Sequence, residues 1–267
     1  MASPERALAI EHLSLLHVAP PDLAQVAADS GFQAIGVRVF HPEPRMSPWP
    51  MLPGSAMLSE TGRRCAELGL RVLTVESLSL TPRLRRADYE AVLHAGAYLR
   101  AEYVNVISDD PDQARARDTF AGLAEAAAEY GLRPALEPIY HRAASSVEQA
   151  VDIVKGAGGG VVQIDVLHLY RSGGTADTVR AIDPRLLSYL QVDDAPATAP
   201  DSIEGRRQES RAGRLLPGEG ELPIRSVVDA MPASAVIALE VTPPDRGEDP
   251  LAFARRARRA LVGALAD

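Results

Sequence analysis

The chain has 267 residues, of which 46% are hydrophobic and 24% charged, and its formal net charge is −8. This composition is typical of a globular protein with a sizeable core, and the acidic balance argues against binding along a nucleic acid or an anionic membrane. No stretch of 18 apolar residues indicates a membrane-spanning helix, and the first ten residues lack the layout of a signal peptide, so we expect a cytoplasmic protein.

Two reactive residue types occur only once each. Lys155 is the only lysine and Cys65 the only cysteine. A disulfide within the chain or a cysteine metal cluster is therefore excluded, and imine or thiolate chemistry would depend on one residue each. We expect carboxylates and histidines to carry any chemistry.

Short apolar runs alternate with helical runs along the whole chain. Three helical runs end at Gly31, Gly69 and Gly131, where a helix C-cap needs a left-handed backbone, and a strand-like run follows each. We expect strands at 7–13, 33–40, 70–76, 103–108, 133–138, 161–165, 186–192 and 235–241. We expect helices at 21–30, 56–68, 87–100, 112–130, 146–156, 174–182, 222–231 and 249–265.

Eight alternating units predict a single (β/α)8 TIM barrel over residues 1–267, with a doubly wound sheet as the alternative. Two long loops, at about 41–55 and 193–221, follow the second and seventh strands. A barrel places both at the C-terminal face of its strands, where active sites occur. The second loop is polar, so a disordered insertion is the other interpretation.

Oxygen-bearing side chains end four successive strands. The fifth strand ends at Glu137 and the sixth at Asp165, the seventh ends in the run QVDD beginning at Gln191, and the eighth ends at Glu240. Three carboxylates buried together without a counter-charge would be very costly, which favours a bound divalent cation. Carboxylate and amide oxygens suit Mn²⁺ or Mg²⁺, with Co²⁺ as a further choice. The alternative is that these acids cap helices or pair with arginines.

The sequence resembles the xylose isomerase-like TIM-barrel superfamily, also called the sugar phosphate isomerase/epimerase family. The matching stretches are ALEPI, QIDVLHLYRSGG, YLQVDDAP, RLLPGEGELPI and ALEV. The resemblance implies that Glu137, Asp165, Gln191 and Glu240 hold the metal ion, and that His168 contacts the substrate.

The sequence also departs from that family's epimerases. Gln191 stands where many of them have histidine, and the segment after Glu137, EPIYHRAAS, lacks a second acid, which argues against a ketohexose 3-epimerase. Gln191 followed by DDAP and an arginine-bearing loop ending in PGEG resembles the 3-dehydroshikimate dehydratases of the superfamily. Arg211 and Arg214 are placed to bind a substrate carboxylate or phosphate, unless they only offset acids nearby.

A metal ion at this site can support three related reactions through an enediolate. Glu137 or Glu240 acts as the base, with His168 as a further catalytic residue. Return of the proton to the other carbon gives isomerisation, return to the other face gives epimerisation, and loss of a β-hydroxyl gives dehydration. His41, Glu76 and Asn105 follow or end other strands and are expected to line the substrate pocket.

From the sequence, the leading hypothesis is a metal-dependent isomerase or epimerase of a sugar or cyclitol. The alternatives are a lyase of 3-dehydroshikimate type and a barrel that binds a ligand without catalysis; a DNA-repair endonuclease is disfavoured by the acidic charge. The expected partner is a small carbonyl compound, with no nucleic acid or membrane. The resemblance leaves a homo-oligomer open, since many such barrels form dimers or tetramers, and the sequence selects no oligomeric state.

Overall fold

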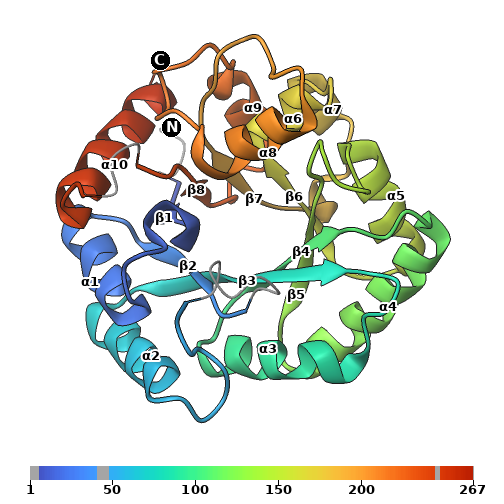
Figure 1. Ribbon diagram of the computed structural model, residues 1–267, viewed down its shortest axis with the longest axis horizontal. Helices are drawn as coiled ribbons and strands as arrows, with labels where there is room; N and C mark the ends of the chain where they lie inside the picture. The colour runs from blue at the N-terminus through green and yellow to red at the C-terminus, as the bar shows by residue number, and fades with distance from the viewer. Residues whose placement is uncertain (1–5, 41–47, 244–246, 267) are drawn as a thin grey trace.

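The computed structural model describes residues 6–40, 48–243 and 247–266. Its eight parallel strands pair in chain order and close into a barrel, with helices around the outside (Figure 1). The strands are β1 Leu8–Ile10, β2 Ala34–Arg38, β3 Arg71–Leu80, β4 Tyr103–Ser108, β5 Arg133–Glu137, β6 Val161–Asp165, β7 Leu187–Val192 and β8 Ile237–Leu239. The predicted (β/α)8 barrel is confirmed.

The outer layer consists mostly of helices expected from the apolar periodicity. These are α1 Pro20–Ser30, α2 Ala56–Leu68, α3 Arg86–Tyr98, α4 Gln113–Glu129, α5 Val147–Ala157, α7 Ala176–Arg180, α9 Ile224–Ala230 and α10 Pro250–Ala266. Gly31 and Gly69 end α1 and α2 as left-handed C-caps, with φ of 88° and 65°. No helix in the described ranges is long and apolar enough to cross a membrane.

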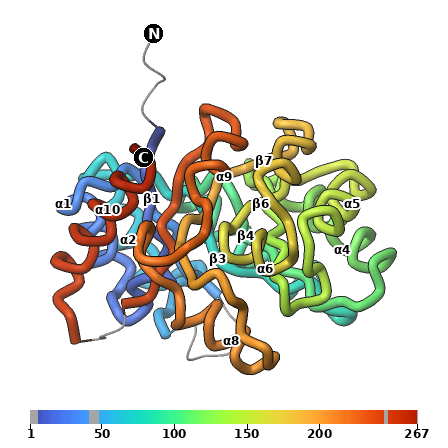
Figure 2. Tube along the Cα trace, turned by 90° about the horizontal axis from the view of Figure 1, so that it is seen from above, coloured from blue at the N-terminus to red at the C-terminus, as the bar shows by residue number. Residues whose placement is uncertain are grey.

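Two helices were not expected from the sequence. Helix α6, Val166–Arg171, begins directly after β6, and helix α8, Ile203–Ala212, lies inside the segment expected to be a loop at 193–221. The Ser202 side chain caps α8 by accepting a hydrogen bond from the backbone N–H of Gly205. Figure 2 shows α8 projecting from the barrel at the lower edge of the view. The segment is therefore partly helical and does not form a disordered insertion.

Strand periodicity separates the barrel interior into an apolar floor and a polar mouth. Ala135, Val161, Tyr189 and Ala238 belong to one apolar cluster contributed by most of the strands. Because side chains alternate between the two faces of a strand, residues an even number of positions further along point into the same interior. This spacing places Glu137, Asp165, Gln191 and Glu240 above the floor, at the C-terminal face.

Candidate active site

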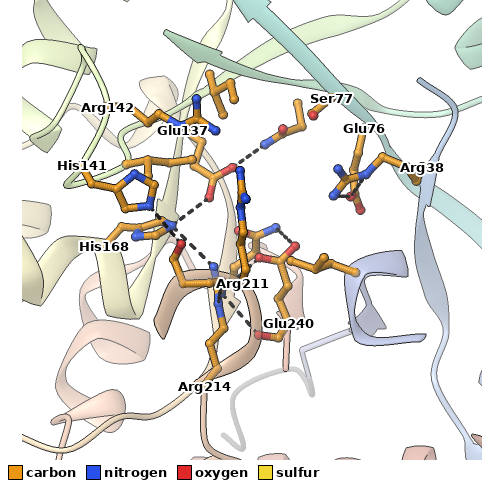
Figure 3. Close-up of a pocket in the computed structure, with 16 residues that line it drawn as sticks. Arg38, Glu76, Ser77, Glu137, His141, Arg142, His168, Arg211, Arg214 and Glu240 are labelled. Atoms are coloured by element: carbon orange, nitrogen blue, oxygen red, sulfur yellow. Dashed lines mark hydrogen bonds and ion pairs between the residues drawn. The ribbon is translucent and has the colours of Figure 1, made fainter. Parts of the chain in front are cut away.

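The four predicted strand-end residues converge in one buried pocket. Glu137 and Asp165 end β5 and β6, Gln191 lies in β7, and Glu240 directly follows β8. All four are at most 6% exposed. Glu137, Gln191 and Glu240 line the pocket directly, and Figure 3 shows the Glu137 and Glu240 side chains directed into it.

A chain of amide hydrogen bonds beneath the pocket links these side chains. Asn105 Nδ2 donates to Glu137 Oε2 at 2.7 Å and to Gln163 Oε1 at 2.8 Å. Gln163 Nε2 donates to Gln191 Oε1 at 2.5 Å, and Gln191 Nε2 donates to Glu240 Oε1 at 3.3 Å. Since an amide oxygen has two lone pairs, Gln191 Oε1 keeps one acceptor position for a cation. This series of hydrogen bonds thus orients three of the candidate metal ligands, Glu137, Gln191 and Glu240.

Arg214 lies among the acids of this site. Its Nη1 atom is 2.7 Å from Asp165 Oδ2, 2.6 Å from Asp193 Oδ2 and 3.0 Å from Glu240 Oε2. Burial opposes its charge, but the three carboxylates raise the pKa of Arg214 well above its ordinary value. Arg214 was expected either to bind substrate or to offset nearby acids. The structure places its guanidinium against three carboxylates of the protein, as an internal counter-charge, and in the lining of the pocket.

One guanidinium does not balance the acids. Burial, followed by repulsion from Glu240 and Asp165, raises the pKa of Glu137 to about 8. Burial also raises the pKa of Glu240 to about 7, against the attraction of Arg214. For Asp165, burial acts to raise the pKa, but Arg214 and His168, through charge and hydrogen bonds, together hold it below its usual value. Acid oxygens held together at this cost fit a divalent cation, which would replace the protons on Glu137 and Glu240.

His168 sits over the acids for a local reason. Asp165 caps α6, and its Oδ1 atom accepts a hydrogen bond from the backbone N–H of His168 at 2.8 Å. The imidazole Nε2 lies 3.7 Å from Glu137 Oε1. Glu137, Asp165 and His168 each offer a ligand atom within 4.8 Å of the others. Burial lowers the pKa of His168 to about 3, so the ring is neutral.

Helix α8 contributes a basic residue, Arg211, to the wall of the pocket and to a neighbouring cleft. Arg211, on α8, and Arg142 line the pocket, which has about 80 Å³ of free space. A cleft of about 590 Å³ shares Arg211 and Leu13 with the pocket and extends past Trp49. Helix α8 is held in place by Glu209, whose carboxylate pairs with Arg171 at 2.7 Å. The sequence segment expected to be a loop therefore closes one side of the site.

Of the remaining residues predicted to line the substrate pocket, three lie in its lining and one falls outside the described residues. Glu76 and Asn105 line the pocket, as does His168. His41 lies outside the described residues. Gln163 and Glu11 were not predicted. The only sequence signal for Gln163 was its alternation with Val161 and Asp165 in β6, and Glu11 directly follows β1 as Glu240 directly follows β8.

The raised acid pKa values predict how metal affinity depends on pH. Below pH 7 to 8, Glu137 and Glu240 carry protons that a cation must displace. We expect the apparent affinity for Mn²⁺ to rise from pH 6 to pH 8.5, by up to about tenfold per pH unit for each displaced proton, and then to level off. Calorimetric titration in buffers of different ionisation enthalpy measures both the affinity and the released protons. An affinity that is independent of pH, with no proton release, would contradict the assignment.

Comparison with known proteins adds the family. The model of the xylose isomerase-like TIM barrel matches residues 24–259 of this chain. No curated protein sequence matches the chain.

Solved structures share the fold at low sequence identity. A xylose isomerase-like TIM barrel/4-hydroxyphenylpyruvate dioxygenase fusion protein has a TM-score of 0.81 and 21% identity over 97% of this chain, which spans 42% of that protein. The IolI protein with a bound zinc atom has a TM-score of 0.78 and 16% identity over 97% of this chain and 98% of its own. The probable 3-DHS dehydratase AsbF from Bacillus anthracis has a TM-score of 0.74 and 13% identity, covering 96% and 98%. These likenesses show the fold alone.

Proposed function

The chain belongs to the xylose isomerase-like TIM barrel family, and from that premise we propose that it is a metal-dependent lyase that removes water from a carboxylated hydroxyketone of 3-dehydroshikimate type. The observation that carries the proposal is the pocket lining, where Arg142 and Arg211 lie beside the acid cluster, with Arg142 also pairing with Asp109 at 2.8 Å. Guanidinium groups bind carboxylates with two parallel hydrogen bonds, and a neutral sugar has no group that needs them. This lining supports dehydration over isomerisation, which is the leading hypothesis from the sequence alone.

Glu137, Asp165, Gln191 and Glu240 would hold the cation. When bound, a divalent ion polarises a substrate carbonyl and stabilises the enolate that forms beside it. The all-oxygen donor set favours Mn²⁺ or Mg²⁺. The IolI structure, which shares the fold, contains a zinc atom, and this supports a divalent metal ion in this chain without identifying the ion.

The protein's own residues then account for the proton transfers. Glu137 takes the proton from the carbon beside the carbonyl, as the carboxylate base of the site. The bond from the next carbon to its hydroxyl breaks, a carbon–carbon double bond forms, and the proton leaves with the hydroxyl as water. His168 is neutral, so its ring can form a hydrogen bond with a substrate oxygen.

The direct test of the proposal is a product assay. Protein loaded with Mn²⁺ is incubated with 3-dehydroshikimate and, separately, with a panel of keto-sugars, and the products are separated on a chiral column. We expect an aromatic dihydroxy acid from the first substrate and no change in the sugars. Conversion of a keto-sugar, with none of 3-dehydroshikimate, would overturn the lyase assignment.

Arg211 provides a test of the substrate carboxylate. Replacing Arg211 with methionine is expected to raise KM for 3-dehydroshikimate about 10- to 100-fold, with a smaller change in kcat, because one charge-assisted hydrogen-bonding group is lost. Steady-state kinetics measure the split between the two constants. Arg207, exposed on the same helix, is the matched control. Equal effects of Arg207→Met and Arg211→Met would argue against carboxylate binding at Arg211.

Isomerisation or epimerisation remains the second candidate because of one observation. Glu137 and Glu240 come from strands on different sides of Gln191, and both have raised pKa values, so one can take a proton and the other return it. Exchange of solvent deuterium into recovered keto-sugar would support this candidate. A barrel that only binds ligands would contain no divalent ion in the purified protein, which elemental analysis of the wild type and Glu240→Gln measures.

A further inference from the structure

A second pair of buried acids lies beside the pocket and outside the candidate metal ligands. Glu11 directly follows β1 and is fully buried, and Glu76, in β3, is 2% exposed. Among the described residues, neither carboxylate oxygen of Glu11 has a hydrogen-bond partner, and Glu76 Oε1 also lacks one. These three acid oxygens form the largest group of buried polar atoms without hydrogen-bond partners among the described residues, so they need an explanation.

A glycine in the neighbouring strand makes room for the two acids. A Cβ atom at Gly36, in β2, would lie 1.5 Å from Glu11 Oε2 and 2.8 Å from Glu76 Oε1. The two orphaned oxygens therefore face the same small space above the Gly36 backbone. Any side chain at this position would displace one carboxyl group, because the contacts are shorter than real Cβ atoms tolerate.

Among the residues that the structure describes, one cation pairs with these two acids. Arg38 donates from Nε and Nη2 to Glu76 Oε2, at 2.9 Å and 2.7 Å. The adjacent His12 is neutral, with a pKa that burial lowers to about 4, and its two ring nitrogens bond to the backbones of Val18 and Arg38. Two ionised carboxylates would leave one buried charge unpaired, which is strongly unfavourable. One proton on Glu11 removes that charge and supplies the missing donor.

We propose that Glu11 is a neutral carboxylic acid that donates a hydrogen bond to Glu76 Oε1, and that this pair fixes Arg38 in the pocket wall to bind hydroxyl oxygens of the substrate. Figure 3 shows Arg38 and Glu76 on the side of the pocket opposite His141, His168 and Arg142. The substrate would then be held at two ends, its carboxylate toward the arginines near α8 and its hydroxyl groups toward Arg38. This inference rests on the proposed function for the identity of the substrate.

The electrostatic surroundings agree with this distribution of one proton. Burial, then the charge of Glu76, raises the pKa of Glu11 well above its ordinary value, and Glu240 and Glu137 add to the effect. Burial opposes ionisation of Glu76 as well, but the Arg38 charge holds the pKa of Glu76 below its usual range. Glu11 is a positioning residue in this scheme, since it acts on the substrate only through Glu76 and Arg38.

Infrared spectroscopy tests the shared proton without any substrate. The wild-type spectrum minus that of Glu11→Gln, both loaded with Mn²⁺ at pH 7, is expected to show the carbonyl stretch of one protonated carboxyl group. Asp110→Asn is the matched control, because Asp110 is buried, its pKa is lowered by its hydrogen bonds with Arg115, and it lies outside the pocket lining. If the carbonyl band of the protonated carboxyl group were the same in the wild-type and the Glu11→Gln spectra, the proposal would be overturned.

Kinetics test the positioning of Arg38. Glu11→Gln keeps the size and the donor, so KM and kcat for 3-dehydroshikimate should stay within about twofold of the wild type. Glu11→Leu removes the donor and should raise KM about tenfold or more with a smaller fall in kcat, as should Arg38→Lys. Equal kinetics of Glu11→Gln and Glu11→Leu would overturn the positioning role. Wild-type protein with no turnover would count against the proposed function, and the infrared result would still decide the shared proton.

Discussion

Replacing Arg214 with methionine is expected to lower the free energy of unfolding of the metal-free protein by about 3–5 kcal/mol. The guanidinium is the counter-charge that Asp165, Asp193 and Glu240 share, and all of these groups are buried. Methionine fills a similar volume but leaves the carboxylates without their cation. Chemical denaturation, with the metal removed by a chelator, measures the loss.

Two comparisons make the Arg214 prediction specific. Arg214→Lys keeps a positive charge and should be less destabilised than Arg214→Met, although it loses the planar geometry that reaches several carboxylates at once. Adding Mn²⁺ should restore part of the stability of Arg214→Met, because a bound cation replaces the missing charge and binds only the folded state. A loss below about 1 kcal/mol for Arg214→Met would show that the acids are protonated rather than paired with Arg214.

Replacing Glu137 with glutamine is expected to lower kcat/KM by about 100- to 10,000-fold, the usual contribution of a general base. The free energy of unfolding should not decrease. Because the pKa of Glu137 is raised, its ionisation costs folding stability as the pH rises toward 8, and glutamine removes that cost. Metal-free Glu137→Gln should therefore be at least as stable as the wild type at pH 8–9.

The Glu137 result has a control among the buried acids. Asp110 is 2% exposed and pairs with Arg115 at 2.6 Å, outside the pocket lining. Asp110→Asn should lose stability, since it breaks a pair that lowers the acid's pKa, and it should keep most of its turnover. Steady-state kinetics and denaturation on both variants separate the two roles. Similar turnover of wild type and Glu137→Gln would remove Glu137 from the proposed mechanism.

Strand periodicity explains why much of the site was visible in the sequence. The ranges expected for β4 and β6, 103–108 and 161–165, and for α2, 56–68, agree with the structure to the residue. Polar residues that directly end or follow apolar strands are local features of the chain. Since parallel strands in a barrel all end at one face, such residues converge once the fold class is known.

Helices α6 and α8 were missed for different physical reasons. Helix α6 follows β6 without a turn, because Asp165 is both the last residue of the strand and the cap of the helix. Helix α8 is mostly polar, and only Glu209 and Ser210 within it are buried, so it has no apolar stripe for a periodicity argument to detect. Packing of Tyr140 and Arg171 against Glu209 holds it on the barrel.

The sequence by itself determined the barrel, the face that carries the site, and the strand-end acids and amide, because each depends on residues close together in the chain. Only the tertiary structure decided how those groups are balanced. Arg214 reaches Asp165 across 49 positions of sequence and Glu240 across 26, and Arg38 meets Glu76 across 38. Such contacts follow from closure of the barrel around its axis, which brings distant side chains into one low-dielectric space where charges must pair or take up protons.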